Sequence, residues 1–191
     1  MKKQVLLLVI LGLIFQLSFA QEKNLLPVIK SYRLLKTNGE TAYITPGKAG
    51  TVFVFLSPEC PLCKNYSPVL QTLQQQNPSV NFYGIIPGNT YSSKQITKFA
   101  DDYQIRFPIL TDKNMKLVKA LQATVTPEAV VLDHAGQVYY RGLIDNWVTA
   151  LGKKRARASE HYLSSAIGSL AAGATVKQTN TEPIGCLINE F

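Results

Sequence analysis

The feature that most limits how this chain can fold is an apolar strand that runs directly into a pair of cysteines. Residues 51–57 read TVFVFLS, a continuous β-branched and aromatic run typical of a strand buried on both faces. Cys60 and Cys63 follow at once, and apolar residues at helical spacing over 64–76 predict a helix. Pro61 suits the first turn of that helix, where a backbone N–H has no partner to lose. The cysteine pair is therefore expected where a buried strand turns into a helix.

Strands and helices alternate along the rest of the chain. We expect further strands over 80–88 and 107–112 and as a pair within 126–145, and helices over 92–104, 113–123 and 157–173. Alternating runs around Asn38-Gly39 predict a hairpin before the first buried strand. This order predicts an α/β fold in which helices flank a central mixed sheet, parallel at its centre and ending in an antiparallel pair. The cysteines would lie at the carboxyl edge of the sheet, where such folds place their chemistry.

The N-terminus has the layout of a secretory signal. A short basic head precedes an apolar run over 5–15, and Ser18 and Ala20 occupy the small-residue positions of a cleavage site. The alternative is an uncleaved membrane anchor, but the run is shorter than the roughly 20 residues of a membrane span. We expect cleavage after Ala20, no stable membrane span afterwards, and a periplasmic or secreted protein whose disulfides can persist.

The formal net charge of +8 raises the question of an anionic partner. The densest basic run, GKKRARAS over 152–159, has no interleaved aromatic residues, and no nucleic-acid motif accompanies it. We interpret this run as the solvated start of the last helix. No nucleic-acid partner is expected.

Three roles can be compared for Cys60 and Cys63. A structural zinc site needs four ligands, and the chain adds only Cys186, His134 and His161, without a second closely spaced pair. A structural disulfide across two intervening residues closes so small a loop that it stabilises little. A redox pair needs a strand-to-helix position of the kind predicted here, and we favour that role.

The redox chemistry has a physical basis at a helix N-terminus. Unpaired backbone N–H groups and the helix dipole favour a thiolate at Cys60, which would attack a partner disulfide, and Cys63, one turn on, would resolve the mixed disulfide. Pro61 fixes the local backbone, and Lys64 adds a cation in the first turn. Glu59 acts in the opposite direction, because a nearby carboxylate disfavours a thiolate. The sequence does not decide which effect is larger.

A buried strand, a CxxC, alternating elements and a Thr-Pro before a strand hairpin together resemble the thioredoxin fold. Over about residues 30–172 the chain is similar to exported bacterial redoxins and thiol–disulfide oxidoreductases such as the periplasmic reductases of cytochrome maturation, which leaves 1–20 as signal and 173–191 as tail. The resemblance implies that Pro127 is a cis-proline facing the CxxC and that the backbone of Thr126 pairs with a substrate chain. It also implies protein thiol or disulfide substrates, an upstream electron donor or acceptor, and no cofactor beyond the cysteines.

Two alternatives follow from related families. Peroxiredoxins carry P-x(3)-T-x(2)-C around their reactive cysteine, but Phe53 and Ser57 occupy the proline and threonine positions here. Copper-delivery proteins of this fold bind the metal with two cysteines and a histidine, for which Cys60, Cys63 and His134 are the candidates. Their cysteines are separated by three residues rather than two.

The tryptophan common before the CxxC is replaced by SPE, which leaves the redox potential and the choice of partner open.

Cys186, within EPIGCLI near the C-terminus, is a possible third redox thiol. A leftover cysteine in an exported protein can oxidise with a partner. Three roles stay open for it: a tail thiol without function, a resolving thiol that folds back to the CxxC, or a metal ligand. The tail also resembles that of bacterial redoxin-domain proteins of unassigned role.

Overall fold

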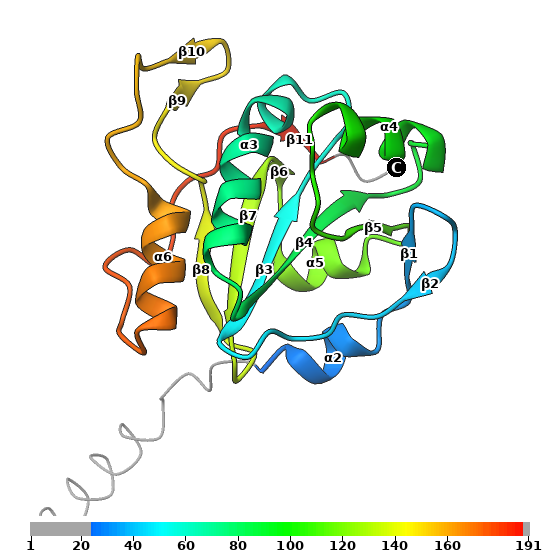
Figure 1. Cartoon of the computed structure of the whole chain (residues 1–191), viewed down its shortest axis with the longest axis horizontal. Helices are drawn as coiled ribbons and strands as arrows, with labels where there is room; N and C mark the ends of the chain where they lie inside the picture. The colour runs from blue at the N-terminus through cyan, green and yellow to red at the C-terminus, as the bar shows by residue number, and fades with distance from the viewer. Residues whose placement is uncertain (1–23, 189–191) are drawn as a thin grey trace, which may run out of the picture.

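The computed structural model describes residues 24–188 (Figure 1). The predicted signal peptide over 1–20 lies outside the described residues. Across 24–188, no helix is both long and apolar enough to cross a membrane.

A seven-stranded mixed sheet forms the centre of the molecule, in the order β2-β1-β5-β4-β3-β7-β8. The strands of this sheet are β1 (Leu34–Lys36), β2 (Thr41–Ala42), β3 (Gly50–Phe55), β4 (Val80–Pro87), β5 (Ile109–Asp112), β7 (Glu128–Asp133) and β8 (Val138–Gly142). The helices are α2 (Leu26–Lys30), α3 (Pro61–Gln76), α4 (Ser93–Asp102), α5 (Lys116–Leu121) and α6 (Tyr162–Ala171). Strands β3, β4 and β5 are mutually parallel, and β7 and β8 add an antiparallel pair. The predicted fold class is thus confirmed.

Strand β3 shows why the sheet is covered on both faces. All six of its residues are buried. Val52 and Val54 pack into the core beneath α3, α4 and α6, whereas Phe53 and Phe55 pack into the core beneath α2 and α5. Each such side chain contributes about 1.5–3 kcal/mol on burial. The continuous apolar run was therefore a correct signal for a two-sided strand.

The N-terminal hairpin joins the sheet as an edge rather than standing apart. Leu34 pairs with Ala42 across the predicted Asn38-Gly39 turn, where Gly39 has φ +84°. Strand β1 then pairs antiparallel with β5. The hairpin prediction is confirmed, and the pairing with β5 could not be foreseen from local pattern.

The last helix begins later than predicted, at Tyr162 instead of 157. The side-chain oxygen of Asn146 accepts hydrogen bonds from the backbone N–H groups of Ser159 (2.8 Å) and Glu160 (3.1 Å). These donors are satisfied by a distant loop, so the chain before Tyr162 follows that loop and does not coil.

The prediction that the basic run 152–159 starts this helix was wrong. Lys153–Lys154 (β10) pairs antiparallel with Val148–Ala150 (β9) in a small separate hairpin. The ammonium of Lys154 lies 5.0 Å from the centre of the Trp147 ring, a cation–π contact. The basic run therefore contains one strand of a surface hairpin and the segment that follows it.

The C-terminal tail also contains a strand that the sequence did not indicate. Cys186–Leu187 (β11) pairs antiparallel with Val125–Thr126 (β6), in a two-stranded sheet beside the main one. In Figure 1 the tail, drawn in red, passes from α6 across to β6. This path brings the third cysteine to the carboxyl edge of β3.

Candidate functional site

The start of α3 positions the two cysteines of the CxxC. Cys60 is the N-cap residue, with extended backbone (φ −72°, ψ 118°), and Pro61 is the first helical residue. Cys60 is 2 % exposed and Cys63 is fully buried within the core on the α3 side of the sheet. The first cysteine thus sits at the helix entrance, and the second is enclosed behind it.

Two neighbouring thiols and two backbone N–H groups, together with burial, determine the ionisation of Cys60. Hydrogen bonding from the Cys63 thiol is the largest influence, and together with the Cys186 thiol and the backbone N–H groups of Cys63 and Leu62 it lowers the pKa of Cys60 to about 5, against the opposing effect of burial. Influences that favour the thiolate therefore exceed those that oppose it. Cys60 is a thiolate at neutral pH, the form that reacts as a nucleophile.

Cys63 is held in the opposite state. Burial, followed by hydrogen bonding to Cys60 and its charge, raises the pKa of Cys63 well above its usual range. The backbone N–H of Ser57 donates to Cys63 Sγ at 3.4 Å and acts in the opposite direction, with a smaller effect on the pKa. Cys63 is thus a protonated, buried thiol, and loss of the charge on Cys60 would remove part of what raises its pKa.

The loop opposite the helix start places a backbone carbonyl against Cys60. The peptide bond between Thr126 and Pro127 is cis, and the carbonyl oxygen of Thr126 lies 3.1 Å from Cys60 Sγ. When protonated, Cys60 donates its hydrogen to this oxygen; when ionised, it accepts from neighbouring thiols instead.

Glu128 fixes this loop and was missed by the sequence reasoning. It is 1 % exposed, and its Oε2 accepts from the backbone N–H groups of Thr124 (2.7 Å) and Val125 (3.3 Å). A buried carboxylate needs such donors. The available signal was an acidic residue within an otherwise apolar strand, directly after the Thr-Pro.

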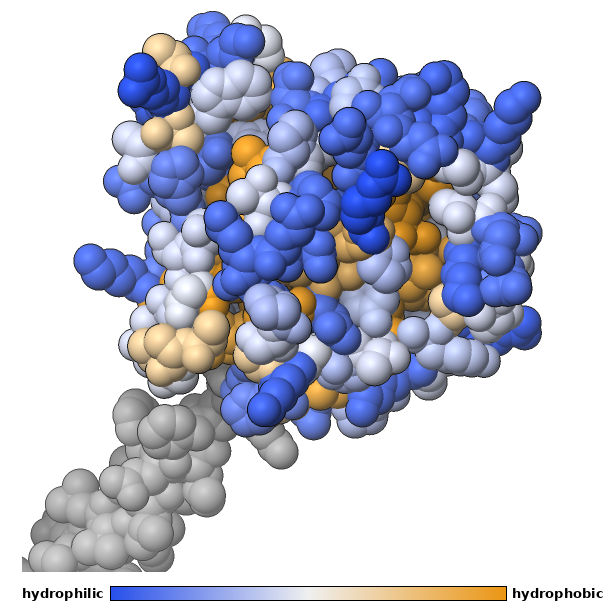
Figure 2. All heavy atoms as spheres, viewed as in Figure 1, coloured by the Kyte–Doolittle hydropathy of each residue, from blue (hydrophilic) through white to orange (hydrophobic). Residues whose placement is uncertain are grey.

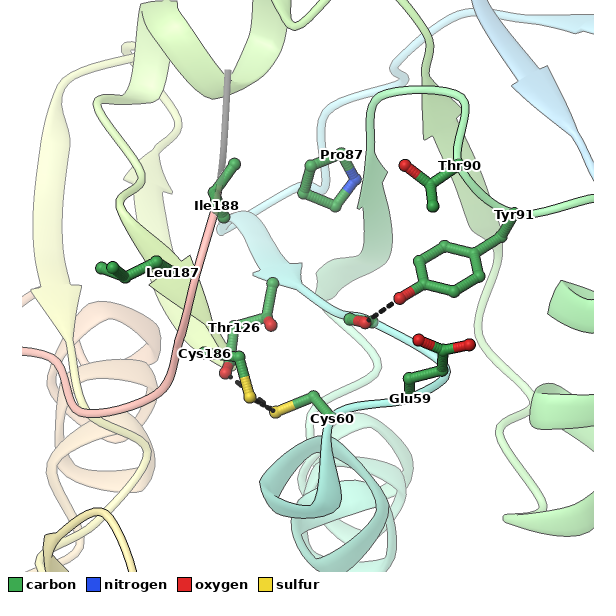
Figure 3. Close-up of a pocket in the computed structure, with 10 residues that line it drawn as sticks. Glu59, Cys60, Pro87, Thr90, Tyr91, Thr126, Cys186, Leu187 and Ile188 are labelled. Atoms are coloured by element: carbon green, nitrogen blue, oxygen red, sulfur yellow. Dashed lines mark hydrogen bonds between the residues drawn. The ribbon is translucent and has the colours of Figure 1, made fainter. Parts of the chain in front are cut away.

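The third cysteine completes the site. Cys186 Sγ lies 2.8 Å from Cys60 Sγ, and the two side chains point toward each other from the tail and the helix start (Figure 3). Burial, followed by hydrogen bonding to the adjacent Cys60 thiolate and its charge, raises the pKa of Cys186 to about 11. Cys186 therefore stays protonated and donates to the thiolate.

A cavity of about 340 Å³ opens beside the thiols. Its walls are formed by Ser57, Glu59, Cys60, Pro87, Thr90, Tyr91, Thr126, Cys186, Leu187 and Ile188. In Figure 3 Glu59 and Tyr91 stand on one side and the tail on the other. The hydroxyl groups of Ser57 and Tyr91 hydrogen-bond at 2.8 Å. A second hollow of about 460 Å³, apolar and bordered by β5, is visible in Figure 2 and contains no cysteine.

Of the predicted site residues, the structure brings Cys60, Thr126 and Cys186 into contact and sets Cys63 directly behind them. His134 lies elsewhere, exposed in the turn after β7. Because Thr126 precedes β7 and His134 follows it, the strand separates them by roughly 20 Å. The copper ligand set of Cys60, Cys63 and His134 is therefore not assembled, and within 24–188 no cluster of three His, Cys, Asp or Glu residues suits a metal ion.

A mixed sheet, with a cysteine pair at a helix start and a cis-proline opposite, defines a thioredoxin-fold protein. Residues 29–141 match the AhpC/TSA family, and the chain belongs to that family. The predicted resemblance to thioredoxin-like redoxins is confirmed. Family and thiols together support a redox function.

Solved structures share the fold at low sequence identity. An uncharacterised conserved protein from Geobacillus kaustophilus is 23% identical with a TM-score of 0.72, covering 84% of this chain and 88% of that one. A hypothetical protein from Sinorhizobium meliloti 1021 is 20% identical with a TM-score of 0.73, covering 82% and 89%. A secreted Mycobacterium tuberculosis disulfide oxidoreductase, described as homologous to E. coli DsbE, is 18% identical with a TM-score of 0.55, covering 74% and 98%. No curated protein sequence gives a significant match.

Proposed function

We propose that this protein is an exported thiol–disulfide oxidoreductase that exchanges disulfides with protein substrates through Cys60 and Cys63. The observation that carries the proposal is the placement of the two thiols: Cys60 is the N-cap of α3, with its Sγ 3.1 Å from the Thr126 carbonyl of the cis Thr126-Pro127 bond, and Cys63 is fully buried in the first turn. This placement lowers the pKa of Cys60 to about 5 and raises that of Cys63 well above its usual range. A nucleophile and a reserve thiol are what two-step exchange requires.

The exchange proceeds in two steps. The Cys60 thiolate attacks one sulfur of a partner disulfide; the other sulfur leaves as a thiolate, and a mixed disulfide links Cys60 to the partner. The charge on Cys60 is then gone, so the pKa of Cys63 falls. Cys63 loses its proton and attacks Cys60 Sγ, and the partner sulfur leaves and takes up a proton. The partner is reduced by two electrons, and the chain holds a Cys60–Cys63 disulfide. An upstream dithiol then reduces this disulfide and regenerates the two thiols. The reverse sequence oxidises a dithiol partner.

Neighbouring residues would position the partner and tune the thiolate. The backbone of Thr126 and the ring of Pro127 would flank the partner chain beside Cys60. Pro61 sets the helix start, while Glu59 on the cavity wall and Lys64 in the first turn add charges of opposite sign. Export to an oxidising compartment, as inferred from the N-terminal sequence, would supply disulfide-bearing proteins as substrates.

Reduction of insulin disulfides by dithiothreitol, followed by turbidity, tests the proposal. The wild-type protein should accelerate the reaction, and Cys60→Ser should reduce it to the uncatalysed rate. Cys63→Ser/Cys186→Ser, in which neither neighbouring thiol can attack Cys60 Sγ, should accumulate mixed disulfides with partner proteins that Cys60→Ser, the control without the nucleophile, does not form. A wild-type protein no faster than the buffer, with equal capture by both variants, would overturn the proposal.

Peroxide reduction is a second candidate, because the chain belongs to the AhpC/TSA family and holds a buried thiolate. Phe53, at the position of the motif proline, packs fully buried in the core, and the Ser57 hydroxyl at the threonine position bonds Tyr91 and lies on the cavity wall. Consumption of hydrogen peroxide in the presence of dithiothreitol, compared between wild type and Cys60→Ser, distinguishes this candidate from disulfide exchange.

A further inference from the structure

The C-terminal segment occupies the position beside Cys60 that a partner chain would need. Strand β11 pairs antiparallel with β6, with Cys186 opposite Thr126 and Leu187 opposite Val125. The backbone N–H of Ile188 donates to the carbonyl of Thr124 at 2.9 Å. The tail thus makes strand contacts to the residues that precede Pro127.

A buried threonine anchors the tail before it reaches this site. Thr181 is 7 % exposed, its Oγ1 accepts from the backbone N–H of Leu143 at 2.8 Å, and its hydroxyl lies 2.8 Å from that of Tyr140. The backbone N–H of Thr181 donates to the carbonyl of Arg141 at 3.0 Å. The tail is therefore docked at two places, on β8 and on β6.

Two glycines make this route possible. A Cβ on Gly142, which has φ +128°, would lie 2.2 Å from the Thr181 carbonyl oxygen. A Cβ on Gly185 would lie 2.3 Å from the Thr126 carbonyl oxygen. The residue immediately before Cys186 must therefore lack a side chain for β11 to approach β6 this closely.

The pairing directs alternate tail side chains to opposite sides. Cys186 faces inward, with its Sγ 2.8 Å from Cys60 Sγ, while Leu187 is 76 % exposed. Cys63, in the first turn of α3, hydrogen-bonds to the same Cys60 thiolate. Two thiols thus contact Cys60 Sγ, and either can attack it.

We propose that residues 185–188 are a tethered occupant of the partner-chain site, and that Cys186 exchanges disulfides with Cys60 as a partner cysteine would. This inference rests on the proposed function of Cys60 and Cys63. In the exchange, Cys186 loses its proton and attacks Cys60 Sγ of the Cys60–Cys63 disulfide. The Cys60–Cys63 bond breaks, the Cys60–Cys186 bond forms, and Cys63 takes up a proton as a buried thiol. The oxidation level is unchanged.

The two oxidised forms differ in access to the site. In the Cys60–Cys186 form the tail is covalently closed over the site, and no partner chain can pair with β6. Attack by Cys63 on Cys60 Sγ reopens the site. A protein disulfide must therefore compete with the chain's own tail, which restricts exchange to extended segments that pair better with β6 than Gly185–Ile188 does.

Disulfide mapping after reaction with glutathione disulfide tests the pairing. In Cys63→Ser, Cys60 takes up one glutathione and releases the other; Cys186 then displaces the bound glutathione to give a Cys60–Cys186 disulfide. Intact mass should show loss of two hydrogens, and the peptides carrying residues 60 and 186 should be joined. In Cys63→Ser/Cys186→Ser the glutathione adduct should persist. In Cys60→Ser the peptides should stay separate, because Cys63 is enclosed in α3.

A persistent adduct in Cys63→Ser, or equal joining of peptides in Cys63→Ser and Cys60→Ser, would overturn the inference. Insulin reduction by the wild-type protein is scored separately, so loss of the tail disulfide with retained reductase activity disproves the inference and leaves the proposed function standing. A tail disulfide without reductase activity would support the pairing of Cys60 with Cys186 and overturn the proposed function.

Occupancy of the site has its own test in the alkylation rate of Cys60. Gly185→Ala should displace the tail from Thr126 and raise the rate of reaction with iodoacetamide several-fold. Gly168→Ala in α6, where an added Cβ meets nothing within 4 Å, is the matched control and should leave the rate unchanged. Equal rates in both variants and wild type would show that the tail does not cover Cys60.

Discussion

The start of α3 and the C-terminal tail each bring a thiol to Cys60, but the two regions hold that thiol in different ways. Cys63 belongs to a sixteen-residue helix whose buried residues lie in the main core. Cys186 belongs to a two-residue strand that is held by backbone pairing to β6 and by the anchor at Thr181. The helix thiol is part of the fold, whereas the tail thiol can be exchanged for that of another chain. Cys63 is therefore a fixed part of the site, whereas Cys186 occupies a position that a partner cysteine can take.

The largest expected contrast comes from the same substitution in each region. Leu70→Ala removes a fully buried side chain from α3 and should lower the free energy of unfolding by about 2–5 kcal/mol. Leu187→Ala in β11 removes a side chain that is 76 % exposed and should change it by less than about 0.5 kcal/mol. Urea denaturation of the reduced proteins measures both. Similar losses would mean that the tail is as integral to the fold as α3.

The sequence predicts the structure of the β3–α3 region well and that of the C-terminal tail poorly. The strand was predicted from a continuous apolar run over 51–57 and the helix from apolar residues at helical spacing over 64–76. Each signal extends over several residues of one segment, and both predictions were correct. Strand β11 has two residues and no period. Its position depends on Thr181 reaching Leu143 and on Gly185 passing close to Thr126, contacts between segments far apart in the chain. Local pattern carries no trace of such contacts.

Candidate site residues divide in the same manner. Cys60 and Cys63 were predicted as a redox pair from their spacing and from the strand-to-helix context, and the structure places both at the start of α3. Cys186 was noted only as a leftover cysteine, since nothing near it specifies that it meets Cys60. Glu128 was missed because its role depends on backbone N–H groups of the preceding loop. His134 was weighed as a copper ligand by resemblance to copper-delivery proteins that use two cysteines and a histidine, and the length of β7 separates it from the thiols.

An intermediate effect is expected at the anchor of the tail. Thr181→Val removes the acceptor for the Leu143 N–H, which costs about 1–3 kcal/mol where the N–H stays buried. Tyr140 keeps its bond to the Leu143 carbonyl at 2.6 Å, so β8 itself should persist. Hydrogen exchange at Leu143, Thr126 and Ile188 should accelerate while exchange in β3 stays slow.

The matched control is Thr72→Val on the exposed face of α3, where the hydroxyl bonds only the Pro68 carbonyl at 2.9 Å. It should alter exchange at none of these positions. If Thr181→Val accelerates exchange in β3 as much as at Ile188, the tail does not open on its own and the comparison between the two regions fails.

The smallest and most specific effect concerns the thiolate. With the pKa of Cys60 lowered to about 5, its alkylation rate should be nearly constant from pH 7 to 9 and fall by half near pH 5. Replacing either neighbouring thiol by alanine removes a hydrogen bond to the thiolate, and because the charged form loses stabilisation, the midpoint must move to higher pH. The Cys63 thiol is the larger influence and the Cys186 thiol the smaller, so the displacement should be greater for Cys63→Ala than for Cys186→Ala. The reverse order would mean that the tail, and not the helix, sets the reactivity of Cys60, because only a thiol held closer than Cys63 can stabilise the charge more.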